Sequence, residues 1–275
     1  MAGALATALG ALGAGYLVDA TRPVGSEGTV SSYRAIIVVY AALGLALAAA
    51  FARLSPDVEA LRVGERKGAL SFAASVSGLD RSRGVILRLS ALFALDAFGG
   101  GFVVQSFAAY WFYLRFHVSP ESLGTIFFWA NVLAGLSALV ASRLAARIGL
   151  IRTMVVTHLP SNVLLMLVPL MPTVTSATWV LWLRFSISQM DVPTRQSYVM
   201  AVVDPAERSA AGGVTGVART IGASLSPLLV GLLYATPGLV NAPFVIAGGL
   251  KCLYDVLLYR SFIGIQTPEE RASKG

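Results

Sequence analysis

Long apolar stretches alternate with short polar segments along the whole chain. Each apolar stretch comes close to the ~20 residues that an α-helix needs to cross a hydrocarbon core of about 30 Å. Breaker-rich segments separate them, such as residues 117–122 (HVSPES) and 203–209 (VDPAERS). The pattern predicts about eight transmembrane helices. The expected spans cover residues 1–19, 34–53, 87–114, 123–142, 152–171, 178–203, 210–234 and 241–262.

Composition agrees with a membrane protein. The chain is 56% hydrophobic and only 13% charged, whereas a soluble domain carries about 25% charged residues. The net charge of +7 does not indicate nucleic-acid binding, because the basic residues lie in short loops between apolar stretches. The single cysteine, Cys252, and the two distant histidines, His117 and His158, form no metal-binding pattern. No metal or other cofactor is expected, and each histidine is expected to be a packed or solvated residue.

The longest polar segment divides the chain into parts. Residues 54–86 are basic and rich in Gly and Ser, which predicts a linker between two bundles. The linker follows two spans within residues 1–53 and precedes a six-span bundle within residues 87–263. A polar tail, 264–275, ends the chain.

Lys and Arg residues predict the orientation in the membrane. Most of them lie on the side of the linker and the tail, whereas the other side holds Arg22, Arg34 and Arg115. Because positive loops stay in the cytoplasm, the linker and the C-terminus are expected there. We expect an integral protein of the plasma membrane, the inner membrane of a bacterium.

A faint internal repeat relates the two ends of the chain. The second span aligns without gaps to the eighth, with Arg53 falling on Arg260. The first two spans would then occupy the place in one bundle that the last two occupy in the other. The fold class expected is an all-α polytopic bundle, with the last two spans of an incomplete N-terminal bundle and a complete six-span C-terminal bundle.

Residues 179–198 carry charges inside an apolar segment. On one continuous helix, five polar residues fall on a single narrow stripe. They are Arg184, Ser188, Asp191, Arg195 and Tyr198. Lipid would not tolerate this stripe, so it should face a hydrated cavity or the bundle interior. Asp191 and Arg195 are one turn apart and can pair, and Pro193 favours a bend. Arg184, Ser188, Asp191 and Arg195 are the candidate substrate pathway; the alternative is that Arg184 lies at the interface and Asp191–Arg195 is structural.

Other ionisable residues lie within predicted spans. Asp96, alone among apolar neighbours, is a candidate proton carrier or the partner of an arginine from another span. Gln105 falls on the opposite face, so a helix–helix hydrogen bond is expected for one of the two. Arg219 is expected to pair with Asp96 or Asp191 and to have a gating or structural role. Lys251 and Asp255, four residues apart, are expected to form an intrahelical pair.

The loop after the fourth span carries a motif of a known family. Residues 142–152 read SRLAARIGLIR, and Leu144, Ala145, Arg147 and Gly149 match the cytoplasmic loop motif of the major facilitator superfamily. Two bundles joined by a basic linker also resemble this family, nearly over the whole chain from what would be its fifth span. Ala146 stands where the motif has Asp, so the resemblance implies no Asp-based gating lock. It assigns gating or structural roles to Arg147 and Gly149.

Two further stretches extend the resemblance. Residues 216–233, GVARTIGASLSPLLVGLL, are similar to the Gly/Pro-rich helix of antiporter members, in which Gly222 and Pro227 would allow close packing and a bend. The first span has Ala11 where that helix has Pro, so the antiporter subset is not assigned. The stretch SQMDVPTRQSYVMAVV with PAERSAA is similar to a bacterial branch of the superfamily.

The resemblance implies a secondary transporter that moves a small organic solute by alternating access, with or without coupling to protons. Its partners would be the solute, the lipid bilayer and a missing N-terminal bundle. One alternative is that the chain is a truncated or split-gene half that is inactive alone. Another is a membrane receptor or structural protein. No enzyme is expected, because neither a Ser-His-Asp set nor paired carboxylates are present.

Overall fold

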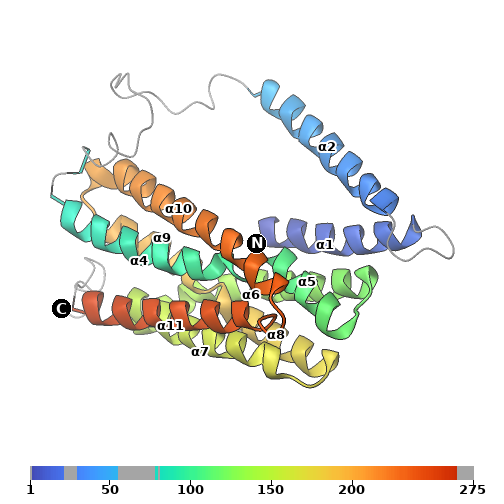
Figure 1. Ribbon diagram of the computed structural model, residues 1–275. Helices are drawn as coiled ribbons and strands as arrows, with labels where there is room; N and C mark the ends of the chain where they lie inside the picture. The colour runs from blue at the N-terminus through green and yellow to red at the C-terminus, as the bar shows by residue number, and fades with distance from the viewer. Residues whose placement is uncertain (1, 22–29, 55–77, 80, 265–275) are drawn as a thin grey trace.

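The computed structural model describes residues 2–21, 30–54, 78–79 and 81–264, and every regular element in this part is a helix (Figure 1). The all-α prediction is therefore confirmed. The α-helices are α1 (Ala2–Ala20), α2 (Val30–Ala52), α4 (Arg83–Gly101), α5 (Gln105–Phe116), α6 (Pro120–Ile148), α7 (Leu150–Leu167), α8 (Val174–Ser188), α9 (Asp191–Val202), α10 (Arg208–Ala235) and α11 (Ala242–Phe262). Two 3-10 helices, η2 (Val168–Leu170) and η3 (Pro205–Glu207), follow α7 and α9.

Seven helical segments of the described chain are long and apolar enough to cross a membrane. The remaining predicted span, 178–203, is divided into α8 and α9 with a two-residue break between them. Pro193 has no N–H to donate to the carbonyl of Gln189, four residues earlier, and its ring crowds that carbonyl. The expected bend is present, but the expected continuous helix over 178–203 is wrong.

The predicted span 87–114 is also interrupted, between Gly101 and Gln105. The glycine run that ends α4 lets neighbouring helices approach its backbone. A Cβ on Gly101 would collide with Ser226 of α10, and a Cβ on Gly99 would lie 3.2 Å from Leu250 Cβ of α11. The chain then turns, and α5 begins after Val104, which has an extended backbone.

Local signals place the helix ends. The predicted cytoplasmic loop around residues 142–152 consists of Gly149 alone, since α6 and α7 extend to either side of it. Gly149 has φ +88°, a conformation that other residues rarely adopt. At the opposite ends, Ser119 accepts a hydrogen bond from Ser122 N at the start of α6, and Thr173 forms a capping box at the start of α8.

The helices of residues 83–262 pack into one bundle, and α1 lies against it. The most extensive contacts join α10 to α4, α11 to α7, and α1 to α6. Two glycines bring α1 and α6 together: a Cβ on Gly15 would lie 2.6 Å from Pro120 O, and one on Gly124 would lie 2.8 Å from Ala11 O. Small residues at an interface are typical of membrane helices. Gly10 and Gly13, by contrast, face open space.

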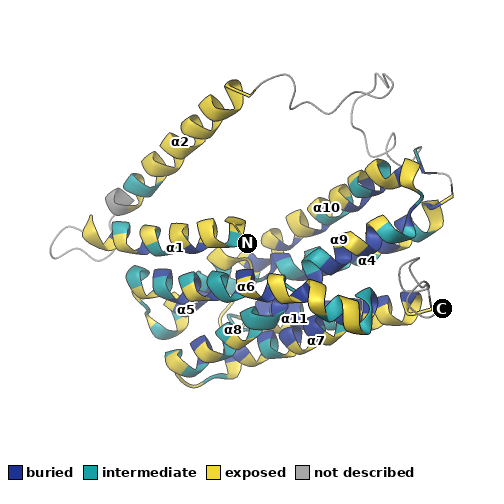
Figure 2. Ribbon diagram, turned by 180° about the vertical axis from the view of Figure 1, so that it is seen from behind, coloured by how far each residue is buried: buried dark blue, intermediate teal, exposed yellow. Residues whose placement is uncertain are grey.

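Helix α2 stands apart from the bundle. None of its side chains that the structure describes is buried, and Figure 2 shows most of the helix exposed. The outer face of α10 is similarly uncovered, with Leu225, Leu228 and Leu232 all more than half exposed. Large apolar faces are unfavourable in water, so lipid or further helices must cover them.

Two apolar cores fill the bundle. The first contains Phe93, Met154, Tyr198 and Tyr254, and the second contains Leu165, Leu181, Phe244 and Ala247. Each of α4, α7 and α11 contributes to both cores, and the α8–α9 pair does so in succession. Side chains that lie between these positions are therefore at mid-depth in the bundle.

Parts of the predicted domain organisation fall outside the described residues. Residues 55–77 and 80 of the expected linker, and residues 265–275 of the expected tail, belong to this group. The division into an incomplete N-terminal bundle and a six-span bundle stays a prediction.

Candidate functional site

A cluster of buried charges lies between the two apolar cores, and Asp96 of α4 is at its centre. Lys251 Nζ of α11 donates to Asp96 Oδ1 at 2.6 Å, and Arg195 Nη1 of α9 donates to Asp96 Oδ2 at 2.9 Å. The three side chains are at most 10% exposed. A single carboxylate thus joins three helices. Because both bonds are charge-assisted, they are among the stronger contacts that a protein can make.

Arg195 has two further partners. Its Nη2 lies 3.3 Å from Asp191 Oδ2, one helical turn earlier on α9, so the predicted Asp191–Arg195 pair is confirmed. Its guanidinium lies over the ring of Phe93 at 5.3 Å, within the range of a cation–π contact. Arg195 is therefore held by side chains of both α4 and α9.

His158 of α7 connects the cluster to a third acid. Its Nδ1 lies 2.8 Å from Asp255 Oδ1 of α11, and its Nε2 lies 3.7 Å from Asp96 Oδ1. Asn162, one turn further along α7, donates to Asp255 Oδ2 at 3.0 Å. We call Asp96, Asp191, Arg195, Lys251, His158, Asp255 and Asn162 the charge cluster.

The predicted intrahelical pair of Lys251 and Asp255 is wrong. Lys251 contacts Asp96, and Asp255 contacts His158 and Asn162. All of these partners lie on other helices. An interhelical bond is favoured because it satisfies a second buried polar group, which would otherwise lose its hydration without compensation.

The stripe predicted on one helix is distributed over two. Arg184 and Ser188 lie on α8, while Asp191, Arg195 and Tyr198 lie on α9. All but Arg184 are buried, and Arg184 is half-buried, so the stripe faces the bundle interior. The lipid-facing placement that would have refuted the prediction is not observed.

Arg184 differs from Arg195 in having no ion pair with any described residue. Its Nε is buried without a hydrogen-bond partner, and its guanidinium lies 5.0 Å from the ring centroid of Phe185, its neighbour on α8. The charges of Asp191 and Asp96 act on it through space. Ser188 Oγ is also buried without a partner in the described chain. These two groups, one helical turn apart, have hydrogen-bonding capacity to spare.

The remaining predicted residues are spread over the molecule. Gln105 accepts a hydrogen bond from Asn131 of α6 at 3.0 Å, which confirms a helix–helix bond for one of Asp96 and Gln105. Arg219 is half-buried on α10 and makes no ion pair within the described residues, although Asp96 and Asp191 act on its charge. Arg147 is exposed, two residues before Gly149.

Two features were predicted for α10, close packing at Gly222 and a bend at Pro227, and only the close packing is confirmed. A Cβ on Gly222 would collide with the Ala94 carbonyl, so this glycine allows α10 to pack closely on α4, as expected. Pro227 is exposed, and α10 runs unbroken from Arg208 to Ala235. The packing does not test the gating or structural roles predicted for Arg147, Gly149 and Arg219.

The place of His158 and Asn162 in the charge cluster was not predicted from the sequence. Both belong to a polar run, Thr157, His158, Ser161 and Asn162, within an otherwise apolar span, and all four are buried. Polar residues inside a span face the bundle interior by default. This run was the signal that could have identified α7 as part of the site.

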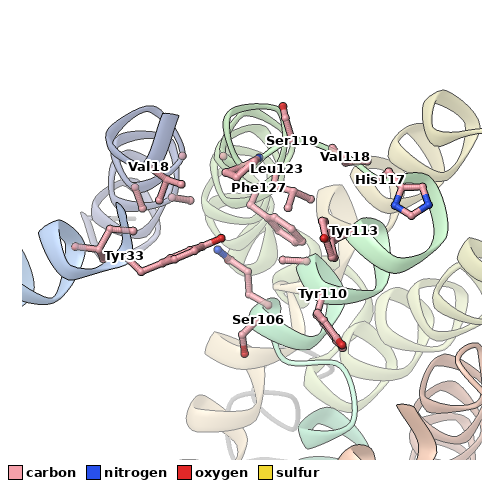
Figure 3. Close-up of a pocket in the computed structure, with 18 residues that line it drawn as sticks. Val18, Tyr33, Ser106, Tyr110, Tyr113, His117, Val118, Ser119, Leu123 and Phe127 are labelled. Atoms are coloured by element: carbon pink, nitrogen blue, oxygen red, sulfur yellow. The ribbon is translucent and has the colours of Figure 1, made fainter. Parts of the chain in front are cut away.

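A second feature is a cavity of about 1060 Å³ between α1, α2, α5 and α6. Figure 3 shows Tyr33 reaching into it from α2, and Tyr110 and Tyr113 lining it from α5. His117 and Gln105 add polar groups. The described residues that line the cavity include no Asp, Glu, Lys or Arg.

A multi-span helical bundle with opposite charges buried at mid-depth is typical of secondary transporters. A sequence model of the Major Facilitator Superfamily matches residues 116–275, more than half of the chain. The chain therefore belongs to the Major Facilitator Superfamily of membrane transporters, and the resemblance predicted from the loop motif is confirmed.

The chain is also similar to a protein of Saccharomyces cerevisiae described as the uncharacterized membrane protein YJR124C. The two are 25% identical over 182 residues, which cover 66% of this chain and 40% of the yeast protein. The chain thus spans about two fifths of the length of that relative.

Proposed function

We propose that the chain is part of a transporter that moves a small organic solute across the membrane by alternating access. The observation that carries this proposal is the charge cluster: three carboxylates and two cations lie at mid-depth in an apolar bundle. Burying charges in this way is costly. Helix packing alone needs no such cluster, so a transport role is the better account of its presence.

The solute pathway runs past the break between α8 and α9. Arg184 and Ser188 present buried polar atoms without partners in the described chain, and Asp191 and Arg195 follow directly on α9. A carboxylate or other anionic group of the solute would satisfy the guanidinium of Arg184. Oriented, desolvated donors of this kind give a small solute both affinity and specificity.

Asp96 is the candidate for proton coupling. A proton on either of its oxygens would take the place of a bond from Lys251 or Arg195. Proton uptake would therefore loosen α4 from α11 or α9. That link between a proton and a helix contact is what a proton-coupled transporter requires.

Further helices, from the same polypeptide or from a partner, would cover the exposed faces of α2 and α10 and complete a first bundle. The uncovered apolar surface supports this proposal. We further propose a plasma-membrane location with the C-terminus in the cytoplasm, on the basis of the Lys and Arg distribution.

Transport by vesicles tests the proposal. Full-length protein is reconstituted into liposomes that contain a pH-sensitive dye, and small organic acids and their neutral amides are added outside. We expect proton movement with particular acids, and its loss in Asp96→Asn while solute binding persists. Arg184→Gln should abolish binding of the acids, whereas Arg143→Gln, a change at an exposed arginine of α6, should not. Unchanged proton-coupled uptake in Asp96→Asn would overturn the assignment of Asp96.

A further inference from the structure

His158 lies between two carboxylates, and its two ring nitrogens face different acids. Nδ1 is within hydrogen-bond distance of Asp255, at 2.8 Å. Nε2 faces Asp96 Oδ1 at 3.7 Å, which is longer than a hydrogen bond. The histidine is 5% exposed. Its ring also makes an edge-on contact with Tyr254, at 5.8 Å between centroids.

The contacts of Asp255 fix which nitrogen carries the proton of a neutral ring. An ionised carboxylate accepts hydrogen bonds and donates none, so Nδ1 must donate to Asp255. Asn162 Nδ2 then donates to the other oxygen of Asp255, at 3.0 Å, and its 3.2 Å approach to Nδ1 is a contact between two donors. The lone pair of Nε2 is left facing Asp96.

The charges around His158 determine the effect of a second proton on its ring. Asp96 on α4, Asp191 on α9 and Asp255 on α11 face only two cations in direct contact among the described residues, Arg195 and Lys251. A neutral imidazole leaves this group with one excess negative charge. An imidazolium removes the excess.

Two neighbouring arginines complete the electrostatic surroundings. Arg184 of α8 and Arg219 of α10 make no ion pair with the described residues, although Asp96 and Asp191 act on both. In the absence of solute, Arg184 offsets part of the excess negative charge. A solute anion bound to Arg184 would cancel that effect, so that the cluster would then favour a proton on His158.

We propose that His158 is the proton-binding site of the charge cluster. A proton from water adds to the Nε2 lone pair, and the imidazolium donates Nε2–H to Asp96 Oδ1. Lys251 now occupies this oxygen at 2.6 Å, so it has to move aside. Deprotonation reverses the exchange. Protonation thus replaces a bond between α4 and α11 by one between α4 and α7.

This inference rests on the proposed function and changes one part of it: the coupling proton binds His158, and Asp96 accepts the hydrogen bond of the protonated ring instead of carrying the proton itself. The inference also predicts the type of coupling. The solute anion and the proton favour each other's binding, as in symport. Proton binding by His158 can nevertheless be measured without any solute. The two proposals can therefore fail separately.

The chain offers a direct measurement, because it contains only two histidines. The chain of residues 1–275, labelled with 15N-histidine, is compared by NMR at about pH 8 and about pH 5, the range in which histidine side chains change charge. His117→Asn removes the other signal and serves as the background variant. Asn is suitable because His117 has φ +54°, which Asn tolerates.

We expect the His158 ring to carry a proton on Nδ1 alone at the higher pH and on both nitrogens at the lower pH. In Asp255→Asn the ring should lose its fixed tautomer and show a mixture of the two neutral forms. A ring whose protonation is the same at both pH values would overturn the proposal, as would a proton found on Nε2 alone at the higher pH.

A third variant tests the exchange with Lys251. Lys251→Met leaves Oδ1 of Asp96 available, so the protonated ring should appear at a higher pH than in the background variant. Arg260→Met, an exposed change on the same helix, should leave the spectrum unchanged. Equal spectra for Lys251→Met and the background variant would overturn the competition between Lys251 and His158. Transport that fails while the NMR result holds would count against the proposed function only.

Discussion

Lys251→Met removes one of the two cations that contact Asp96 and keeps a side chain of similar length. The bond from Arg195 to Asp96 Oδ2 remains, but Asp96 Oδ1 loses the bond from Lys251. The Asp96 side chain is only 5% exposed, so water cannot readily replace that bond. Breaking a buried ion pair by removing one partner costs about 3–5 kcal/mol. Because Arg195 still compensates Asp96, we expect about 3 kcal/mol, at the lower end of that range.

Thermal unfolding in detergent, followed by circular dichroism, measures this loss. In chains of this size about 1 kcal/mol corresponds to about 2–4 °C, so the expected decrease in Tm is roughly 6–12 °C. Arg260→Met changes an exposed cation on the same helix and should alter Tm by less than about 2 °C. The double variant Asp96→Asn/Lys251→Met removes one acid and one cation together, and it should recover about half of the loss.

Two results would refute this reasoning. If Lys251→Met and Arg260→Met had the same Tm, the Lys251–Asp96 bond would not stabilise the bundle. If the double variant lost as much stability as the two single variants combined, the two residues would act independently. Either outcome would mean that α11 is held to α4 by apolar packing alone.

Three other contacts give predictions of their own. Gly15→Leu should displace α1 from α6, since even a Cβ would crowd the α6 backbone, and faster amide hydrogen exchange in α6 should report it; Gly13→Leu faces open space and should not change the exchange. Trp111→Phe removes the 2.8 Å bond from Nε1 to Asn241 Oδ1 and should cost about 1 kcal/mol, measured as a decrease in Tm. Glu207→Ala removes the acceptor of two backbone N–H groups just before α4 and should cost about 1–3 kcal/mol, with faster proteolysis at that junction as the test.

Much of the fold could be predicted from the sequence, because hydrophobic length is decided locally. A helix that crosses a bilayer must satisfy its own backbone, so about 20 apolar residues define it without reference to its neighbours. The breaks within the predicted spans were harder to predict than the spans themselves. Pro193 indicated the division of α8 from α9, because its effect on the carbonyl of Gln189 is local. The division of α4 from α5 was not predicted, although the run of glycines from Gly99 to Gly101 that ends α4 is a local signal for a break.

The site could be predicted only in part, for the opposite reason. Asp96 and Arg195 were identified one at a time, because a charge in an apolar segment is visible without its partner. Their pairing spans 99 residues of sequence, and that of Asp96 with Lys251 spans 155. Spacing along a helix gave the correct partner for Arg195 in Asp191, and the wrong one for Lys251 in Asp255. No local rule distinguishes these two cases.

The way the helices are joined suggests which parts of the molecule move together. Helices α4, α7, α9 and α11 are connected through Asp96 and Asp255, so separating any of them would expose an unpaired charge to an apolar environment, at a cost of several kcal/mol. Helix α1 lies on α6 through small residues around Gly15 and Gly124, and such a contact can slide or open without leaving a charge behind. We therefore expect the charge-linked helices to move as one body. Under the alternating access that we propose, rocking would take place at the α1–α6 contact, and the proposed protonation of His158 would change how the charge-linked helices are joined.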